Sequence, residues 1–433
     1  MWKNICEKFR FHLLKESKID GRWILLFFVF VLFSFIVISS FFRSYHVFWN
    51  TIIPGIWPPF ADTRVITAGY ECSLLGYNVF LSNPCNYITV NYPHIWITLA
   101  SLGNLNQNST IPIGIFLSFS FFSSFFLSIS RINMLEVFIY SSLFYSPSIL
   151  LALERGNSDL IIFTLLATTM VLIRNSAYMK RLVGYVIILL ASILKLYPVF
   201  AFISVFKERK KMALPLFLLL GIFFAIYCGF IFKDIQVINQ ITPRPTYFGY
   251  GIVVLPELLG SYLLPYYPAP FSNIKFFIKL FPQLRLVLAV GIFIFISCSM
   301  YIFIRKYNTF FSHLFHSHIS HDHMESFRIG ASIYIGTFLL GNNYDYRLIF
   351  LLFTIPQLIS WIKKDENIGL SCCALFGIIG TTWLGKWSFF YIDELINWFL
   401  FIYFLCMLVS TLPEWLKSEL RFYSSRIGNI KIR

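Results

Sequence analysis

The residues best suited to chemistry lie in a polar stretch, residues 57–96, that separates two strongly apolar runs. Within it Asp62 follows two prolines. Proline is tolerated in a first helical turn, and an acidic side chain there meets the positive end of the helix dipole, so we expect a short helix from about Phe60 to Leu75. A carboxylate in its first turn either only stabilises the helix or acts as a general base towards an alcohol. The residues alone leave both interpretations open.

The composition of the rest of the chain is that of a membrane protein. Of its 433 residues, 58% are hydrophobic, 20% are aromatic and only 13% are charged, which lies far outside the range of a soluble domain. The formal net charge of +15 comes from Lys and Arg in short flanks between apolar runs, the pattern of orientation signals and not of nucleic-acid binding. We therefore expect a single, all-α, polytopic integral-membrane domain without a nucleic-acid partner.

The basic flanks predict how this domain is oriented. A first span, Trp23–Phe42, is long enough to cross the membrane and is flanked by basic residues on its N-terminal side, so it should run outward. Carried through the chain, the same rule gives ten full crossings, among them a single span over residues 132–153, and one broken pair, about 10–12 helices in all. The predicted segments outside the spans are a cytoplasmic N-terminus (1–22), two extracytoplasmic loops (43–110 and 233–282), a His-rich cytoplasmic loop (305–328) and a cytoplasmic tail (413–433).

The broken pair lies in residues 182–206, which have basic flanks at both ends and are interrupted at Lys195-Leu196-Tyr197-Pro198. Proline disrupts a helix and restricts the residue before it, so two short helices should meet at this point. A lysine deep in such a segment costs on the order of 2.5–3.5 kcal/mol unless it finds an anion or extends to the interface. Lys195 is therefore a functional candidate, with an extended, interfacial lysine as the alternative.

The cysteines offer one structural possibility and no metal site. Cys72 and Cys85 lie on the first outer loop, whereas most of the other six lie in apolar runs where a thiol behaves as a small hydrophobic group. No spacing of Cys and His indicates metal ligands, and the histidines of residues 305–328 are read as part of a solvated linker. If the loop faces an oxidising compartment, Cys72 and Cys85 can form a disulfide, but two cysteines on one loop need not have compatible geometry.

Many polar residues fall at the predicted outer ends of spans. Such an arrangement suits an amphiphilic substrate whose polar head is processed at the outer leaflet, with a carboxylate as general base and Arg or Lys holding a phosphate leaving group. Charges avoid the hydrocarbon in any case, so topology alone would produce part of this pattern. The candidates are Asp62 as the catalytic residue and, for substrate binding, Arg64, His94, Glu154, Arg155, Asn157, Lys195, Arg244, Asp345 and Arg347.

Five short motifs resemble a family of membrane enzymes. The chain is predicted to have a first span with its N-terminus in the cytoplasm, followed by an outer loop with an Asp close to the membrane. This arrangement resembles the C-type superfamily of integral-membrane glycosyltransferases. Within it, the motifs are similar to those of the polyprenol-phosphate-mannose-dependent mannosyltransferases, and the resemblance spans about Trp23 to Trp361 in order and spacing. They are Phe60-Ala61-Asp62, Tyr92-Pro93, Glu154-Arg155-Gly156-Asn157, Leu194-Lys195-Leu196-Tyr197-Pro198 and Asn343-Tyr344-Asp345-Tyr346-Arg347.

The resemblance implies an inverting, cofactor- and metal-independent transfer of a hexose such as mannose. The donor would be a polyprenyl-phosphate sugar, its phosphate bound by basic residues, and the acceptor a lipid- or polymer-linked glycan, with Asp62 as general base. The chain departs from the commonest loop of the family in its Asp-Thr-Arg after Phe-Ala and in its two loop cysteines, so the sugar and acceptor stay open.

Two other classes of function are compatible with the residues. A lipid or solute transporter would place ionisable groups in broken helices near the midplane, as Lys195 does, but often shows repeats, and none is visible. A non-catalytic subunit of an envelope-assembly complex would need none of the outer charges. In each case the expected location is the inner or plasma membrane, with lipids as neighbours.

Overall fold

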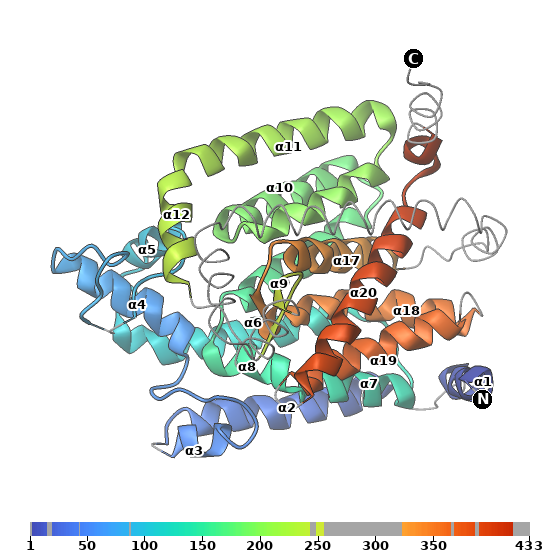
Figure 1. Cartoon of the computed structure of the whole chain (residues 1–433), viewed down its shortest axis with the longest axis horizontal. Helices are drawn as coiled ribbons and strands as arrows, with labels where there is room; N and C mark the ends of the chain where they lie inside the picture. Colours follow the sequence, from blue (N-terminus) through green and yellow to red (C-terminus); the bar gives the residue numbers. More distant parts are fainter. Residues whose placement is uncertain are drawn as a thin grey trace, which may run out of the picture.

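The computed structural model describes residues 2–14, 20–42, 44–85, 88–242, 248–254, 323–364, 368–385 and 389–418. This part of the chain is mostly helical, as the composition predicts. Figure 1 shows the longer helices lying roughly side by side in one bundle. Arg244, nearly all of the predicted loop 233–282 beyond residue 242, and most of the His-rich segment 305–328 lie outside the described residues.

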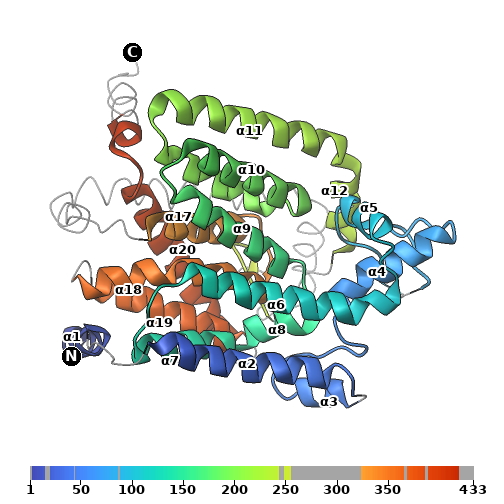
Figure 2. The ribbon, with the colours of Figure 1, turned by 180° about the vertical axis from the view of Figure 1, so that it is seen from behind.

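The two ends of the bundle are built from different segments. One end carries α3 (Tyr45–Trp49), α4 (Ala61–Leu74), α5 (Ile95–Leu102) and α12 (Phe232–Ile241). The opposite end carries α1 (Trp2–Leu14) and the C-terminal end of α20 (Phe390–Ser410), and the view from behind agrees (Figures 1 and 2). The segment around Asp62 and the N-terminal helix therefore lie at opposite ends of the apolar helices.

Four helical segments of the described chain are long and apolar enough to cross a membrane. They contain α2 (Gly21–Ser39), α6 (Thr110–Ser128, preceded by the short η1, Gln107–Ser109), α11 (Lys210–Phe230) and most of α20. Two bent pairs bring the number to six if each pair is one span. Several long apolar helices thus make the chain a multi-pass membrane protein.

The bent pairs differ from the predicted straight crossings. Residues 132–153 were expected to form one helix, but α7 (Met134–Phe144) and α8 (Pro147–Arg155) meet at an angle of 55°. Pro147 starts α8 because its ring cannot continue the preceding helix. Likewise η5 (Asp345–Phe353) and α18 (Ile355–Lys363) meet at 47°. Ten full crossings are therefore not present as long straight helices in the described residues.

The predicted break at Lys195 is present. Helix α10 (Tyr178–Leu194) ends at Lys195, whose backbone is extended, and a 3₁₀ helix, η2 (Tyr197–Lys207), continues the chain. Together with α9 (Asp159–Ile173) and α17 (Met324–Leu339) these elements pack in the centre of the bundle. Nearly every residue of α17 is buried, so its surroundings are protein and not lipid.

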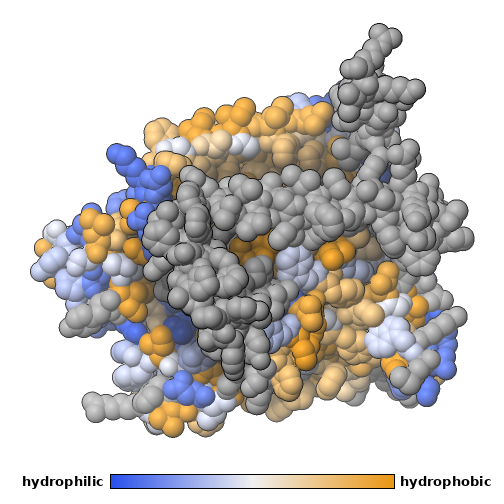
Figure 3. Space-filling model, in the orientation of Figure 1, coloured by the Kyte–Doolittle hydropathy of each residue, from blue (hydrophilic) through white to orange (hydrophobic). Residues whose placement is uncertain are grey.

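Helix α11 has the opposite character. It lies along one side of the bundle, and its outward face carries large apolar side chains, among them Leu218, Ile222 and Phe223, that are more than half exposed. Figure 3 shows apolar surface running along this helix. In water such a face would be unfavourable, whereas a lipid environment accepts it, so α11 borders the hydrocarbon region.

The remaining elements are two helices and a pair of short strands. Helix α19 (Ile368–Leu384) packs against α18 and α20, and α1 packs against α19. Two short strands, β1 (Gly249–Tyr250) and β2 (Asn343–Tyr344), pair antiparallel with Gly249 opposite Tyr344. This pairing fixes the start of η5, because the N–H of Asp345 donates to the carbonyl of Phe248 at 2.8 Å.

Candidate active site

Asp62 lies in the first turn of α4, as predicted, and the start of this helix is anchored to the end of α8. Phe60 precedes the helix with a φ of 57°, and its N–H donates to the Glu154 carbonyl at 3.2 Å. The Thr63 hydroxyl donates to the Gly156 carbonyl at 2.6 Å. Gly156 has a φ of 56°, and a Cβ there would meet the Thr63 hydroxyl at 2.6 Å, so this close approach requires glycine.

Asn157, the next residue, connects Asp62 to the interior. Its side-chain N–H donates to Oδ2 of Asp62. Its Oδ1 accepts a hydrogen bond from Nζ of Lys195 at 3.1 Å and another from the N–H of Asp159 at 2.8 Å. Because the amide is held on both sides, the orientation of the Asp62 carboxylate depends on Lys195 through one intervening side chain.

Asp159 is the anion that the buried Lys195 requires. Oδ1 of Asp159 accepts from Nζ of Lys195 and from the hydroxyl of Tyr197, the latter at 2.6 Å. Its Oδ2 lies 3.8 Å from Nε of Arg347, whose guanidinium also donates to Oδ1 of Asn343. The ion pair with Asp159 thus offsets the free-energy cost of burying Lys195, and the side chain does not extend to an interface.

Aromatic rings surround the two cations. Nζ of Lys195 lies 5.5 Å from the ring centre of Tyr92 and 5.9 Å from that of Tyr346. The guanidinium carbon of Arg347 lies 5.0 Å from the ring centre of Tyr197. At these distances the rings attract the cations and exclude water from them. We call Asp62, Asn157, Asp159, Lys195 and Arg347 the Asp62 network.

Exposure divides the cations near Asp62 into two kinds. The side chain of Lys195 is 10% exposed, whereas those of Arg155 and Arg347 are 21% and 23% exposed. The side chains of Arg155 and Arg347 are therefore more open to a ligand than that of Lys195, although Nε of Arg347 is itself buried. Arg155 also holds the loop, because it pairs with Glu154 at 3.3 Å and donates to the Pro54 carbonyl at 3.2 Å.

The environment shifts the pKa of Asp62 upward. Burial among protein atoms raises it above the ordinary value of 3.8, while the charge of Arg155 and the hydrogen bond from Asn157 counteract part of that rise. The residue as a whole is nevertheless only partly buried. A carboxylate with a raised pKa and an oriented hydrogen bond can accept a proton from a bound hydroxyl.

Glu154 was predicted to bind substrate, but its side chain contacts the backbone of the preceding loop. It is fully buried, and its Oε1 accepts from the Ile56 N–H at 2.8 Å. The Tyr45 hydroxyl donates to its backbone carbonyl at 3.3 Å. Arg64, which is also buried, donates to the Pro58 carbonyl in the same loop. These contacts indicate that Glu154 and Arg64 hold residues 54–60, which precede the helix of Asp62, in place.

The other predicted site residues lie apart from the Asp62 network. His94 is exposed just before α5, with its ring 5.0 Å from that of Phe80. Asp345 is completely buried, and neither of its carboxylate oxygens has a hydrogen-bond partner in the part of the chain that the structure describes. Arg244 lies outside that part. The fold therefore brings only some of the predicted site residues together around Asp62.

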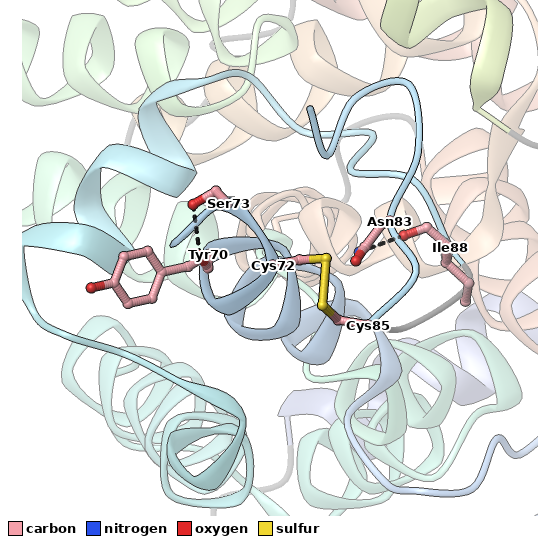
Figure 4. Close-up of a disulfide and its surroundings, with 6 residues drawn as sticks. All are labelled: Tyr70, Cys72, Ser73, Asn83, Cys85 and Ile88. Carbon is pink, nitrogen blue, oxygen red and sulfur yellow. Dashed lines mark hydrogen bonds between the residues drawn. A yellow bond between two sulfur atoms is a disulfide. The ribbon is translucent and has the colours of Figure 1, made fainter. Parts of the chain in front are cut away.

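Cys72 and Cys85 form a disulfide in the structure, with their Cα atoms 5.7 Å apart. Figure 4 shows this bond joining α4 to the loop that follows it. Asn83 in that loop donates to the Ile88 carbonyl at 2.8 Å, and the Ser73 hydroxyl donates to the Tyr70 carbonyl at 2.6 Å. The bond connects the C-terminal half of the helix that carries Asp62 to the adjoining loop.

Three residues that contact Lys195 or Arg347, directly or through Asp159, were not among the site residues predicted from the sequence. Asp159 could have been found, because a buried lysine in an apolar segment requires an anion. Tyr197 and Asn343 belong to noted motifs, but nothing in their spacing predicts that they contact Asp159 and Arg347. Among the described residues no group of three or more His, Cys, Asp or Glu side chains has the arrangement of a metal site.

Comparisons of this chain with protein-family models, with curated proteins and with solved structures gave no match in any of the three.

Proposed function

We propose that the chain is a membrane glycosyltransferase that moves a hexose, such as mannose, from a polyprenyl-phosphate carrier to a lipid- or polymer-linked acceptor. The observation that carries the proposal is the convergence on Asp62 of residues from distant motifs. Asn157 and Lys195 approach it through hydrogen bonds, and Arg347 joins them through Asp159. The motif resemblance supplies the class of reaction.

In this mechanism the acceptor hydroxyl oxygen attacks the anomeric carbon as the bond from that carbon to the carrier phosphate breaks. The hydroxyl proton passes to the Asp62 carboxylate, and the bonding electrons leave with the polyprenyl phosphate. Attack from the face opposite the phosphate inverts the anomeric configuration. No metal or cofactor is required, because cationic side chains can neutralise the leaving phosphate.

Arg155 and Arg347, whose side chains are partly exposed, are the proposed phosphate-binding residues. Each offers charge-assisted N–H donors in a planar fork that matches phosphate geometry. Lys195 contributes mainly as a positioning residue, because its Nζ is occupied by Asp159 and Asn157. It holds Asn157 so that the amide N–H faces the Asp62 carboxylate.

The test is transfer from a radiolabelled polyprenyl-phosphate mannose donor into lipid- or polymer-linked product in membranes with and without the protein. A polyprenyl-phosphate glucose donor run in parallel addresses the choice of hexose. Product that depends on the protein supports the proposal. Uptake or release of a labelled lipid or solute without any glycosidic product would instead support a transporter.

A further inference from the structure

Arg347, one of the two residues proposed to bind the donor phosphate, has few polar contacts. Its Nε lies 3.8 Å from Oδ2 of Asp159, which is too long for a hydrogen bond, and its guanidinium carbon lies 5.0 Å from the ring centre of Tyr197. Within the described residues, the one hydrogen bond of the guanidinium group runs from Nη1 to Oδ1 of Asn343. Asn343 is therefore the polar side chain that most directly sets the orientation of this group.

The amide of Asn343 can face Arg347 in only one way. The residue is 4% exposed, and its Nδ2 donates to the carbonyl of Thr337 at 2.5 Å and to that of Gly341 at 3.3 Å. A carbonyl oxygen only accepts hydrogen bonds, so the NH₂ side of the amide must face these two carbonyls. The amide oxygen is thereby directed at the guanidinium group of Arg347.

The backbone around this amide is closely packed. Asn343 pairs with Tyr250 in the two-stranded sheet, and Thr337 belongs to the buried helix α17. The Gly341 carbonyl lies so close to Gly251 that a Cβ on Gly251 would be 1.5 Å from its oxygen. A side chain that is held by such packing keeps its partner in one orientation.

This arrangement selects one nitrogen of Arg347 for a ligand. Nη1 is engaged by Asn343 and Nε is buried, which leaves Nη2 as the nitrogen available to an oxyanion. A long arginine side chain that is free to rotate would lose conformational entropy when it binds phosphate. Holding the planar group in place beforehand lowers that cost and strengthens binding.

We propose that Asn343 is a positioning residue for the sugar donor, because it directs Nη2 of Arg347 at the phosphate of the polyprenyl-phosphate carrier. The inference rests on the proposed transferase function and adds a residue to it. The alternative is that Asn343 only stabilises the turn between α17 and β2 through its hydrogen bonds to Thr337 and Gly341. A purely stabilising residue would change the amount of folded protein and not the apparent affinity for the donor alone.

The test is a double-mutant cycle in the labelled-donor assay, with kcat and the apparent KM for donor and acceptor measured for wild type, N343A, R347Q and N343A/R347Q. We expect N343A to raise the donor KM about fivefold, the scale of one hydrogen bond, with a smaller effect on the acceptor KM. In the R347Q background N343A should not raise the donor KM further, because the side chain that Asn343 positions is then absent. An unchanged donor KM in N343A, or an equal effect of N343A in both backgrounds, would overturn the inference.

N342A is the matched control, since it removes the same kind of side chain from the preceding residue, and its donor KM should stay close to that of wild type. N343D keeps the size of the side chain but places a carboxylate beside Arg347. That carboxylate would compete with the phosphate for the guanidinium group, so the donor KM should rise at least as much as in N343A. Should N343A not be recovered as folded protein, an unchanged donor KM in N343D would overturn the inference. Loss of folded protein in both variants would assign Asn343 to the stabilising role and would also overturn it.

The inference and the proposed function fail in different ways. Absence of transfer by the wild-type protein would overturn the proposed function. Transfer with a donor KM that rises in R347Q but not in N343A would leave the function in place and remove only Asn343 from the site. An unchanged donor KM in R347Q would likewise overturn the inference alone, because Asn343 would then have no phosphate-binding group to position.

Discussion

Two groups of buried acidic side chains in this protein differ in their partners. In the Asp62 network, Asp159 is paired with Lys195 and lies 3.8 Å from Arg347, and Asp62 receives a hydrogen bond from Asn157. The second group includes Asp393, in the first turn of α20, and Asp345 at the start of η5. Both are at least 98% buried, yet both oxygens of Asp345 and Oδ1 of Asp393 have no hydrogen-bond partner among the described residues.

The difference shows that burial of a carboxylate is not enough to define a catalytic site. A general base must be oriented, must be reachable by the hydroxyl that it deprotonates, and must lie near groups that stabilise the leaving group. Asp62 has an orienting amide, partial exposure and nearby cations. Asp345 is completely buried and has no such partner among the described residues. The comparison therefore favours Asp62 over Asp345 as the base.

The largest expected effect is on turnover in D62N. Asparagine is nearly isosteric and is itself suited to a helix start, so expression, membrane insertion and donor binding should persist. Loss of the proton acceptor should lower kcat by at least about two orders of magnitude, as measured by the labelled-donor assay. The matched control is E71Q, which makes the same carboxylate-to-amide change on the same helix and should retain near-wild-type kcat.

If D62N transfers sugar at close to the wild-type rate, Asp62 serves only the helix start, a role worth about 0.3–1 kcal/mol. Loss of turnover in E71Q but not in D62N would move the base to Glu71. If neither variant loses turnover, the base must be sought at Glu154 or Asp345, although both are fully buried.

The second effect concerns stability and contrasts the two acidic groups directly. D159N leaves Lys195 buried without its anion, and such a loss typically costs about 3–5 kcal/mol. D345N removes a buried carboxylate that has no hydrogen-bond partner in the described part of the chain, so it should leave the melting temperature unchanged or raise it. Thermal unfolding of the purified protein measures both variants. An equal decrease in the two would show that the ion pair to Lys195 is not what distinguishes them.

A double variant sharpens this result. D159N/K195M removes both charges of the pair, and replacing a buried ion pair by apolar groups is often neutral. It should therefore recover most of the stability that D159N loses. Transfer activity should stay low, because Asn157 would lack the Lys195 contact that fixes its amide. Recovery of full activity together with stability would remove Lys195 from the positioning role.

A smaller effect is expected on donor affinity when an accessible cation is removed. R347Q and R155Q should each raise the apparent KM for the polyprenyl-phosphate donor by about tenfold, the scale of one charge-assisted hydrogen bond, with a smaller effect on the KM for acceptor. R209Q, which changes an exposed arginine before α11, is the control. An unchanged donor KM in both variants would exclude these side chains from phosphate binding.

Local features of the structure were predictable from the sequence where short-range chemistry decides them. The helix that carries Asp62 runs from Ala61 to Leu74 and was expected from about Phe60 to Leu75. The break at Lys195 was expected from Pro198. The bend before Pro147 follows from the same rule, but the continuous apolar character of residues 132–153 favoured a single span.

Long-range contacts were not predictable in the same way. From the sequence, Asn157 and Arg347 were candidates at the outer ends of spans, and Lys195 was a candidate at a break between helices. No periodicity of the sequence predicts that the three belong to one hydrogen-bonded network. Glu154 and Arg64 carry charges suited to a substrate, and only the fold shows that they contact backbone groups of residues 54–60. Tertiary packing decides which charges are used structurally and which stay accessible.

The smallest expected effect is on the pH dependence of transfer. Because burial raises the pKa of Asp62 above 3.8, its charged form is disfavoured in the folded protein, and the acid limb of kcat/KM should lie above that value. The same shift affects stability. Folding becomes less favourable as the pH rises through the pKa that Asp62 has in the unfolded chain, and this loss is complete above its pKa in the folded protein.

The hydrogen bond that Asn157 donates favours the charged form of Asp62 and so works against the rise of its pKa. N157A should therefore move the acid limb to still higher pH, because a carboxylate that loses a donated hydrogen bond holds its proton more strongly. A profile of N157A that coincides with wild type would show that the group titrating in kcat/KM is not the carboxylate that this amide contacts, and an acid limb that persists in the residual activity of D62N would lead to the same conclusion.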